Sequence, residues 1–343
     1  MKKRQFSALL AGLCASFALG LPLPAAAAPY KDEYKLSTVL GEAFPWGWGA
    51  KRWADLVAEK TQGRIKIKVY PGTSLVSGDQ TKEFTALRQG IIDIAVGSTI
   101  NWSPQVKELN LFALPFLMPD HKAIDALTHG RVGKKMFELL AERDVVPLAW
   151  GENGFREVSN SKKPIRTPDD LKGLKMRVVG SPLFLATFSA LGANPTQMSW
   201  ADAQPAMATG AVDGQENPLG VFSAAKLHTV GQKHLTLWGY VADPLIFVVN
   251  KNVWNSWTPE DQKAVAEAAQ QAAREEIARA RAGISAGDDA LLKEIAANGV
   301  TVTTLTEAER EGFRKATAGV YKEWAGKVGA ELVKQAEEDI AKR

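Results

Sequence analysis

An arginine interrupts a strand-like stretch of the sequence, LKMRVVGSP, at residues 174–182. Leu174, Met176 and Val178 alternate onto one face of this stretch, and a Gly-Ser-Pro break ends it. Arg177 lies on the opposite face. Three roles are open for it there: exposure to water, an ion pair with an acid of the same lobe, or binding of an anionic ligand. A guanidinium can hold a carboxylate by two parallel hydrogen bonds. The break places Arg177 near the carboxyl end of the strand, where open α/β sheets bind ligands.

Residue patterns typical of catalysis are weak. No HExxH motif, phosphate-cradling GxxxxGKS or strand-linked GxGxxG is present, and the GISAG at 283–287 follows a long polar helix instead of a strand. The four histidines form no close ligand pair and are His121, His129, His228 and His234. We therefore expect a protein that is not an enzyme, with no metal and no cofactor.

The N-terminus has the layout of a secretory signal peptide. Lys2, Lys3 and Arg4 precede a short apolar run and then small residues. We expect residues 1–27 to be removed, with cleavage after Ala28 an equal alternative, and the mature protein to be periplasmic. The chain's one cysteine lies in the apolar run, so the mature chain has no thiol for catalysis, metal binding or disulfides.

Charge and length describe an ordinary exported globular protein. The chain has 343 residues and a formal net charge of +4, of which three charges belong to the leader. No basic run suggests a nucleic-acid partner. The length allows two domains with a sizeable core.

Strand and helix patterns alternate along the mature chain. Strands are predicted within 34–40, 64–72, 91–97, 145–151, 174–179 and 245–250, and helices within 47–63, 78–90, 167–173, 183–192, 258–283 and from about 306 onward. This alternation predicts an α/β fold with parallel strands covered by helices.

Several longer phrases resemble one family. NGFREVSNSKKPIRTPDDLKGLKMRV, then GAVDGQENPLGVFSAAKLHTVGQKHLTLWGYVADPLIFVVN, and the shorter GRIKIKVYPG, GIIDIAV and LFALPFL occur in the order and spacing of the solute-binding proteins of tripartite ATP-independent periplasmic (TRAP) transporters. The resemblance covers nearly all of the mature chain. It implies two α/β lobes joined by a hinge, which close on a carboxylate ligand. It also implies delivery to a membrane permease made of a small and a large subunit.

The resemblance assigns ligand contacts to four residues. Arg177 is the family's main carboxylate clamp, Arg156 the second arginine, Asn217 of DGQENP a ligand contact, and Trp200 the aromatic at the start of the next helix. Other roles remain open from the residues themselves: a structural salt bridge for Arg156, a turn for Asn217 before proline, and core packing for Trp200. Pro205 interrupts the predicted continuous helix after Trp200, so this helix either bends or starts later.

Four further candidates complete the predicted site. Trp46 and Tyr240 belong to a set of aromatics that either stack on the ligand or pack in the core, together with Phe44, Trp48 and Trp102. Ser98 stands where sialic-acid-binding relatives carry an acid, which argues against sialic acid. Glu152 is either a pocket acid or a surface-loop residue. The expected ligand is a small organic acid: a C4-dicarboxylate, a keto or hydroxy acid, or a sugar acid.

The chain is expected to pass between the lobes along its strands, because no linker composition separates them. Lobe I then comprises residues 28–153 and 243–282, and lobe II residues 154–242 and 283–343. An exported enzyme that orients a carboxylate substrate through Arg156 and Arg177 is the alternative function, and a sensor's ligand module is a third.

Overall fold

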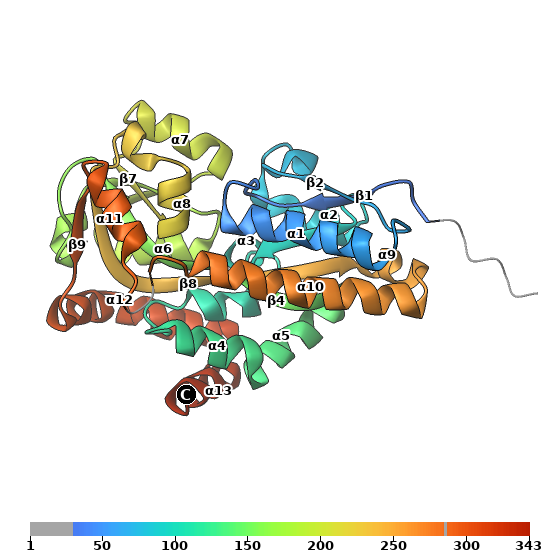
Figure 1. Ribbon diagram of the computed structural model, residues 1–343. Helices are drawn as coiled ribbons and strands as arrows, with labels where there is room; N and C mark the ends of the chain where they lie inside the picture. The colour runs from blue at the N-terminus through green and yellow to red at the C-terminus, as the bar shows by residue number, and fades with distance from the viewer. Residues whose placement is uncertain (1–29, 285–286) are drawn as a thin grey trace, which may run out of the picture.

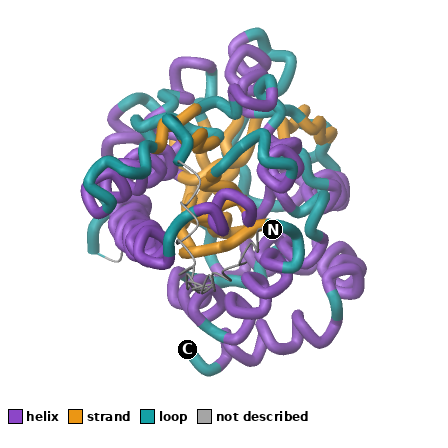
Figure 2. Tube along the Cα trace, turned by 90° about the vertical axis from the view of Figure 1, so that its right-hand side faces the viewer, coloured by secondary structure: helices purple, strands orange, loops and turns teal. Residues whose placement is uncertain are grey.

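The computed structural model describes residues 30–284 and 287–343, so the predicted signal peptide lies outside the described residues. Its architecture is the expected α/β fold, with a mixed sheet surrounded by helices (Figures 1 and 2). The strands are β1 (Tyr34–Ser37), β2 (Ile67–Tyr70), β3 (Ile94–Ser98), β4 (Val145–Asn160), β5 (Lys175–Val178), β6 (Asn194–Gln197), β7 (Gly214–Pro218), β8 (His234–Asn250) and β9 (Thr301–Thr304).

Two long strands, β4 and β8, hold the sheet together. The strand order is β2-β1-β3-β8-β4-β7-β5-β6, and β9 pairs with β8. The C-terminal part of β8 pairs with β3, and its N-terminal part pairs with β9. The C-terminal part of β4 pairs with β7. The two ends of β8 therefore pair with different short strands, β4 pairs with β7 at its C-terminal end and with β8 along its length, and the chain crosses the molecule without a flexible linker.

Helices surround this sheet. They are α1 (Pro45–Lys60), α2 (Glu83–Arg88), α3 (Thr99–Trp102), α4 (His121–His129), α5 (Arg131–Ala141), α6 (Pro182–Ala190), α7 (Trp200–Ala208), α8 (Leu219–Ala224), α9 (Lys251–Ser256), α10 (Pro259–Ala280), α11 (Ala290–Ala297), α12 (Glu307–Val328) and α13 (Ala330–Ala341). Figure 1 shows α1 and α10 side by side, joined by a hydrogen bond from Trp53 Nε1 to the Val265 carbonyl (3.2 Å). Within the described residues, no helix combines the length and apolarity needed to cross a bilayer.

The core is divided differently on the two faces of the sheet. On one face, Leu245, Phe247 and Val249 of β8 belong to a cluster with α1 and α10, while a separate cluster forms among α7, α8 and α11. The alternate residues Ile246 and Val248 turn to the other face, into a core that continues from α4 and α5 to α6 and α12. One face is thus continuous, and the other is split into two clusters.

Local sequence signals explain several of the helix boundaries. Thr258 accepts a hydrogen bond from the Asp261 amide and starts α10, with Pro259 in its first turn. The predicted short helix after Thr167 is a single 3₁₀ turn, Pro168–Leu171, closed by a capping box between Thr167 and Asp170. Helix α7 begins at Trp200 and contains Pro205, so it neither starts late nor ends at the proline.

The C-terminal helix α13 packs against α4 and α5. Arg131 forms an ion pair with Asp339 (2.7 Å), and Arg343 forms one with Asp120 (3.0 Å). The end of the chain is therefore attached to helices that come from its first half. These contacts lie beneath the continuous face of the sheet.

Candidate functional site

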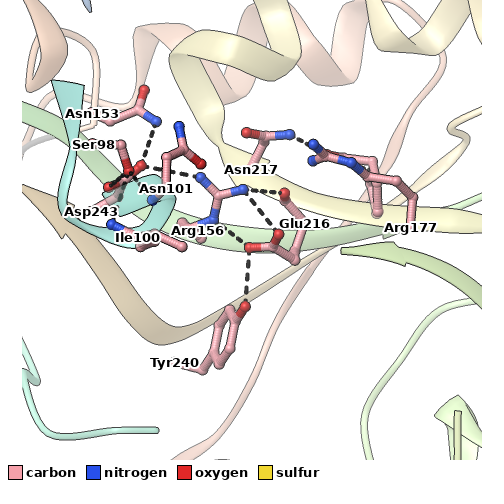
Figure 3. Close-up of polar contacts among 12 residues, drawn as sticks. Ser98, Ile100, Asn101, Asn153, Arg156, Arg177, Glu216, Asn217, Tyr240 and Asp243 are labelled. Carbon is pink, nitrogen blue, oxygen red and sulfur yellow. Dashed lines mark hydrogen bonds and ion pairs between the residues drawn. The ribbon is translucent and has the colours of Figure 1, made fainter. Parts of the chain in front are cut away.

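Arg177 is buried in β5 without an ion-pair partner among residues 30–284 and 287–343, and its side chain is drawn in Figure 3. The residue is only 1% exposed. Its Nε donates to the Met198 carbonyl (3.0 Å) and its guanidinium lies 5.8 Å from the Trp200 ring centroid. Burial lowers the pKa of Arg177 to about 10, an effect that the negative charge of Glu216 partly offsets. A solvated role is therefore excluded by the structure.

The guanidinium of Arg177 keeps most of its donors for another group. Arginine carries five N–H donors, one on Nε and four on the two Nη atoms. Only the Nε donor of Arg177 forms a hydrogen bond with the described part of the chain. An isolated buried cation is costly. The arrangement is therefore chemically suited to receive an anion with two oxygens.

Arg156, in β4, differs because it is fully engaged with acids. Its Nε donates to Glu216 Oε2, its Nη2 donates to Glu216 Oε1 (2.9 Å) and to the Glu216 carbonyl (2.8 Å), and its Nη1 donates to Asp243 Oδ2 (3.3 Å). Although burial alone would lower the pKa of Arg156, the charge of Glu216 and then that of Asp243 raise it. Arg156 thus forms the structural salt bridges that were considered as its alternative role.

Two hydroxyl groups form hydrogen bonds with these acids (Figure 3). The Ser98 hydroxyl donates to Asp243 Oδ1 (2.6 Å), and the Tyr240 hydroxyl donates to Glu216 Oε2 (3.0 Å). Burial raises the pKa of Asp243, while Arg156 and the hydrogen bonds from Asn153 and Ser98 oppose that rise. Ser98 and Tyr240 therefore act on the acids that hold Arg156.

These groups line a narrow, partly open cavity between the two split core clusters, with a volume of about 20 Å³, which is room for about one water molecule. Among the described residues, its lining consists of Val39, Leu40, Trp46, Gln80, Asn101, Asn153, Arg156, Arg177, Val179, Trp200, Asn217 and Asp243. Five of the eight predicted site residues are in this lining, and they are Trp46, Arg156, Arg177, Trp200 and Asn217.

The cavity combines apolar walls with amide groups. Trp46 Nε1 donates to the Val96 carbonyl (2.7 Å), which holds the indole at the start of α1. Asn217 lies within β7 opposite Glu157 and donates to Gln215 Oε1 (2.5 Å), so it is a strand residue and does not form the turn considered above. A charged donor, amides and aromatic walls are the set that binds a small polar organic anion.

The comparisons with known proteins agree with this geometry. The sequence model described as "Bacterial extracellular solute-binding protein, family 7" matches residues 36–327. The chain belongs to this family. Within it, the TRAP periplasmic solute-binding proteins are the structural neighbours, and the two-lobe α/β fold expected from the sequence is confirmed.

Three relatives illustrate the range of this solute-binding family. A solved TRAP periplasmic solute-binding protein from Ralstonia eutropha H16, with bound (S)-2-acetolactate, is 68% identical, covers 92% of this chain and 100% of its own, and superimposes with a TM-score of 0.91. The 2,3-diketo-L-gulonate-binding periplasmic protein of Escherichia coli is 33% identical over 84% of this chain and 86% of the relative. The C4-dicarboxylate-binding periplasmic protein of Rhodobacter capsulatus is 32% identical over 97% of each chain.

Glu152 does not line the cavity of this solute-binding protein, contrary to its expected place in the site. It is 1% exposed, and its Oε2 accepts from Arg281 Nε (3.0 Å), so it is not a surface-loop residue either. Its neighbour Asn153 lines the cavity and donates to Asp243 Oδ2 (2.9 Å). Successive strand residues point to opposite sides, and a bulge between Glu152 and Gly154 interrupts the pairing there.

Hydrogen bonds also join the two sides of the cavity. Gln80, in a 3₁₀ turn (Gln80–Lys82), donates to Asn101 Oδ1 (2.7 Å) and accepts from the Trp200 backbone amide (2.9 Å). The hydroxyls of Ser103 and Ser181 lie 3.4 Å apart. At Gly180, an added methyl group would lie 2.4 Å from Thr81 Cγ2. In this solute-binding protein, residues on the two sides of the cavity are therefore in close contact with each other.

Seven lining residues were not predicted from the sequence: the apolar Val39, Leu40 and Val179, and the polar Gln80, Asn101, Asn153 and Asp243. Asp243 could have been identified from the sequence, because an acid in the otherwise apolar stretch YVADPLIFVVN is as unusual as Arg177 in its own strand. The three amides, Gln80, Asn101 and Asn153, have no such unusual sequence context. In the described ranges, no three His, Cys, Asp or Glu side chains come together as a potential metal site.

Proposed function

We propose that this protein is the periplasmic receptor of a TRAP transporter and captures a small organic acid through Arg177. The observation that carries the proposal is a buried guanidinium, 1% exposed, that lines the cavity while four of its N–H donors bind no described residue. A carboxylate would supply both the missing charge and the missing acceptors.

The remaining lining groups hold the rest of the ligand. Arg156 can offer one further N–H, because its other donors are used by Glu216 and Asp243. Asn217 and Asn153 present amides, and Trp46 and Trp200 form the aromatic walls. Of the expected ligand classes, a keto or hydroxy acid has the support of the Ralstonia eutropha relative, which is described with bound 2-acetolactate at 68% identity.

Binding is coupled to closure of two lobes in this proposal. Residues 28–153 with 243–282 form one lobe, and residues 154–242 with 283–343 form the other. The split core clusters and the two ends of β4 and β8 support this division. Contacts such as Gln80 with Trp200 belong to the closed state. A ligand that touches both sides favours that state, which a permease of small and large subunits then recognises.

A thermal-shift screen of the mature protein against a library of small carboxylates tests the proposal. Ligand at about 100 times its dissociation constant adds roughly 2.7 kcal/mol to the free energy of unfolding. We expect (S)-2-acetolactate or a related hydroxy or keto acid to raise the melting temperature. Lys175→Ala is the matched control, since Lys175 is an exposed cation on the same strand and should leave the shift unchanged. If no carboxylate in the library stabilises the protein, the proposal is wrong.

A further inference from the structure

The charges around the cavity are unevenly distributed. Three charged side chains line it: Arg156, Arg177 and Asp243. Arg156 forms ion pairs with both Glu216 and Asp243, whereas Arg177 forms none with a described residue. The site therefore has one cation available to a ligand carboxylate. A second carboxylate on the same ligand would find no unpaired cation.

The two ends of the site also differ in chemistry. Figure 3 shows Asp243 and Arg177 on opposite sides of Arg156. A ligand carboxylate at Arg177 would direct the rest of the molecule toward the Asp243 end. There, Asn153 and Asn101 contribute amides, and Asp243 contributes an ionisable acid that is 1% exposed. An acid buried at this end repels a second anion and accepts a hydroxyl.

Asp243 has room for one more donor. Its oxygens accept from Ser98 (2.6 Å), Asn153 (2.9 Å) and Arg156 (3.3 Å). A carboxylate has about four acceptor positions in its two oxygens, so three contacts leave one. A ligand hydroxyl can occupy it, but a carboxylate has no proton to donate and adds a like charge at a desolvated position.

We propose that this cavity selects hydroxy acids with a single carboxylate over dicarboxylates, and that Asp243 is the residue that sets this preference. The inference rests on the proposed function and refines it, because the family contains receptors for both kinds of acid. Arg177 binds the carboxylate, and Asp243 accepts the hydroxyl. The selection against a second carboxylate comes from charge.

Two acids of similar size provide the test. 2-Acetolactate carries one carboxylate, and 2-methylmalate keeps the same hydroxyl-bearing carbon and methyl group but replaces the acetyl group with a carboxymethyl group. We expect calorimetry at pH 7.5 to show at least about 100-fold tighter binding of 2-acetolactate to the wild-type protein, since like charges at a desolvated site cost several tenfold steps in affinity. Asp243→Asn should lower the ratio of the two dissociation constants, 2-methylmalate over 2-acetolactate, by at least about tenfold, chiefly by strengthening 2-methylmalate binding.

Controls separate this inference from the proposed function. Asp55→Asn removes an exposed acid from α1 and should leave the ratio unchanged. Asp243→Ser replaces Asp243→Asn if the latter does not fold. Equal or tighter binding of 2-methylmalate to the wild-type protein overturns the inference alone, as does an unchanged ratio in the folded Asp243 variant. Absence of binding by both acids, and by every other carboxylate in the library, overturns the proposed function and this inference with it.

Discussion

Replacing Arg177 by methionine should abolish ligand binding without weakening the free protein. Methionine keeps the length and apolar stem of the side chain but removes the guanidinium. In the proposed complex the guanidinium makes two charge-assisted hydrogen bonds, each contributing about 1.5–3 kcal/mol. Their loss amounts to about 3–6 kcal/mol, which raises the dissociation constant by about 100- to 20,000-fold.

The free protein should respond in the opposite direction. Burial lowers the pKa of Arg177 from its ordinary value to about 10, so the folded state disfavours this cation. A shift of this size corresponds to an electrostatic cost on the order of 3 kcal/mol, present at every pH below about 10. The substitution removes this cost, but it also removes the hydrogen bond to Met198 and the contact with Trp200. We expect the free energy of unfolding to stay equal or to rise by about 1–2 kcal/mol.

Thermal unfolding with and without (S)-2-acetolactate measures both effects in one experiment. The variant should show an equal or higher melting temperature without ligand and no ligand-induced shift. Arg177→Lys should also lose most of the affinity, because an ammonium group cannot form the planar two-bond contact. A variant that melts several degrees lower would show that Arg177 is structural. A variant that keeps the wild-type shift would show that the carboxylate binds elsewhere.

Two further predictions concern stability and closure. Burial raises the pKa of Glu83 to about 7, against the opposing hydrogen bonds from Ser37 and Trp102. The folded state therefore retains a proton that the unfolded state loses above about pH 4.5, and the free energy of unfolding should fall by on the order of 1 kcal/mol per pH unit from there to about pH 7. Urea titrations at several pH values in this range should show that the free energy of unfolding falls less steeply with pH in Glu83→Gln than in the wild-type protein. An equally steep fall in the variant would contradict the assignment to Glu83. Gly180→Ala should weaken binding about tenfold and keep the scattering radius of gyration large at saturating ligand, because its methyl group meets Thr81 at 2.4 Å. Thr81→Ser removes the opposing methyl and should restore closure in the double variant, so normal compaction of Gly180→Ala alone would rule out this contact.

Features that depend on residues close together in the sequence could be predicted from it, and features that depend on distant residues could not. Alternation and turn residues act over a few positions, and they predicted the strand of Arg177 and the helix that begins after Thr258. The unusual charge in an apolar strand identified Arg177 as a candidate, and the resemblance to the family supplied its expected role as a carboxylate clamp. The same local signals support the α/β architecture.

Partners that are distant in the sequence could not be predicted. Arg156 and Glu216 are 60 positions apart, and only the antiparallel pairing of β4 with β7 brings them together. The cavity lining includes Asn153 and not the predicted candidate Glu152, and the two lie at a bulge whose existence depends on the pairing of β4 with β8. Local composition carries no record of such a register shift.

The most direct test of the central claim compares an acid with its own neutral ester. Calorimetric titration of the wild-type protein with 2-acetolactate and with its methyl ester changes the ligand's charge while keeping the hydroxyl and acetyl groups. If the buried guanidinium of Arg177 captures a carboxylate, the ester should bind at least about 100-fold more weakly than the acid. Equal affinities for the acid and the ester would contradict the account, because the cavity would then recognise the molecule without using its charge.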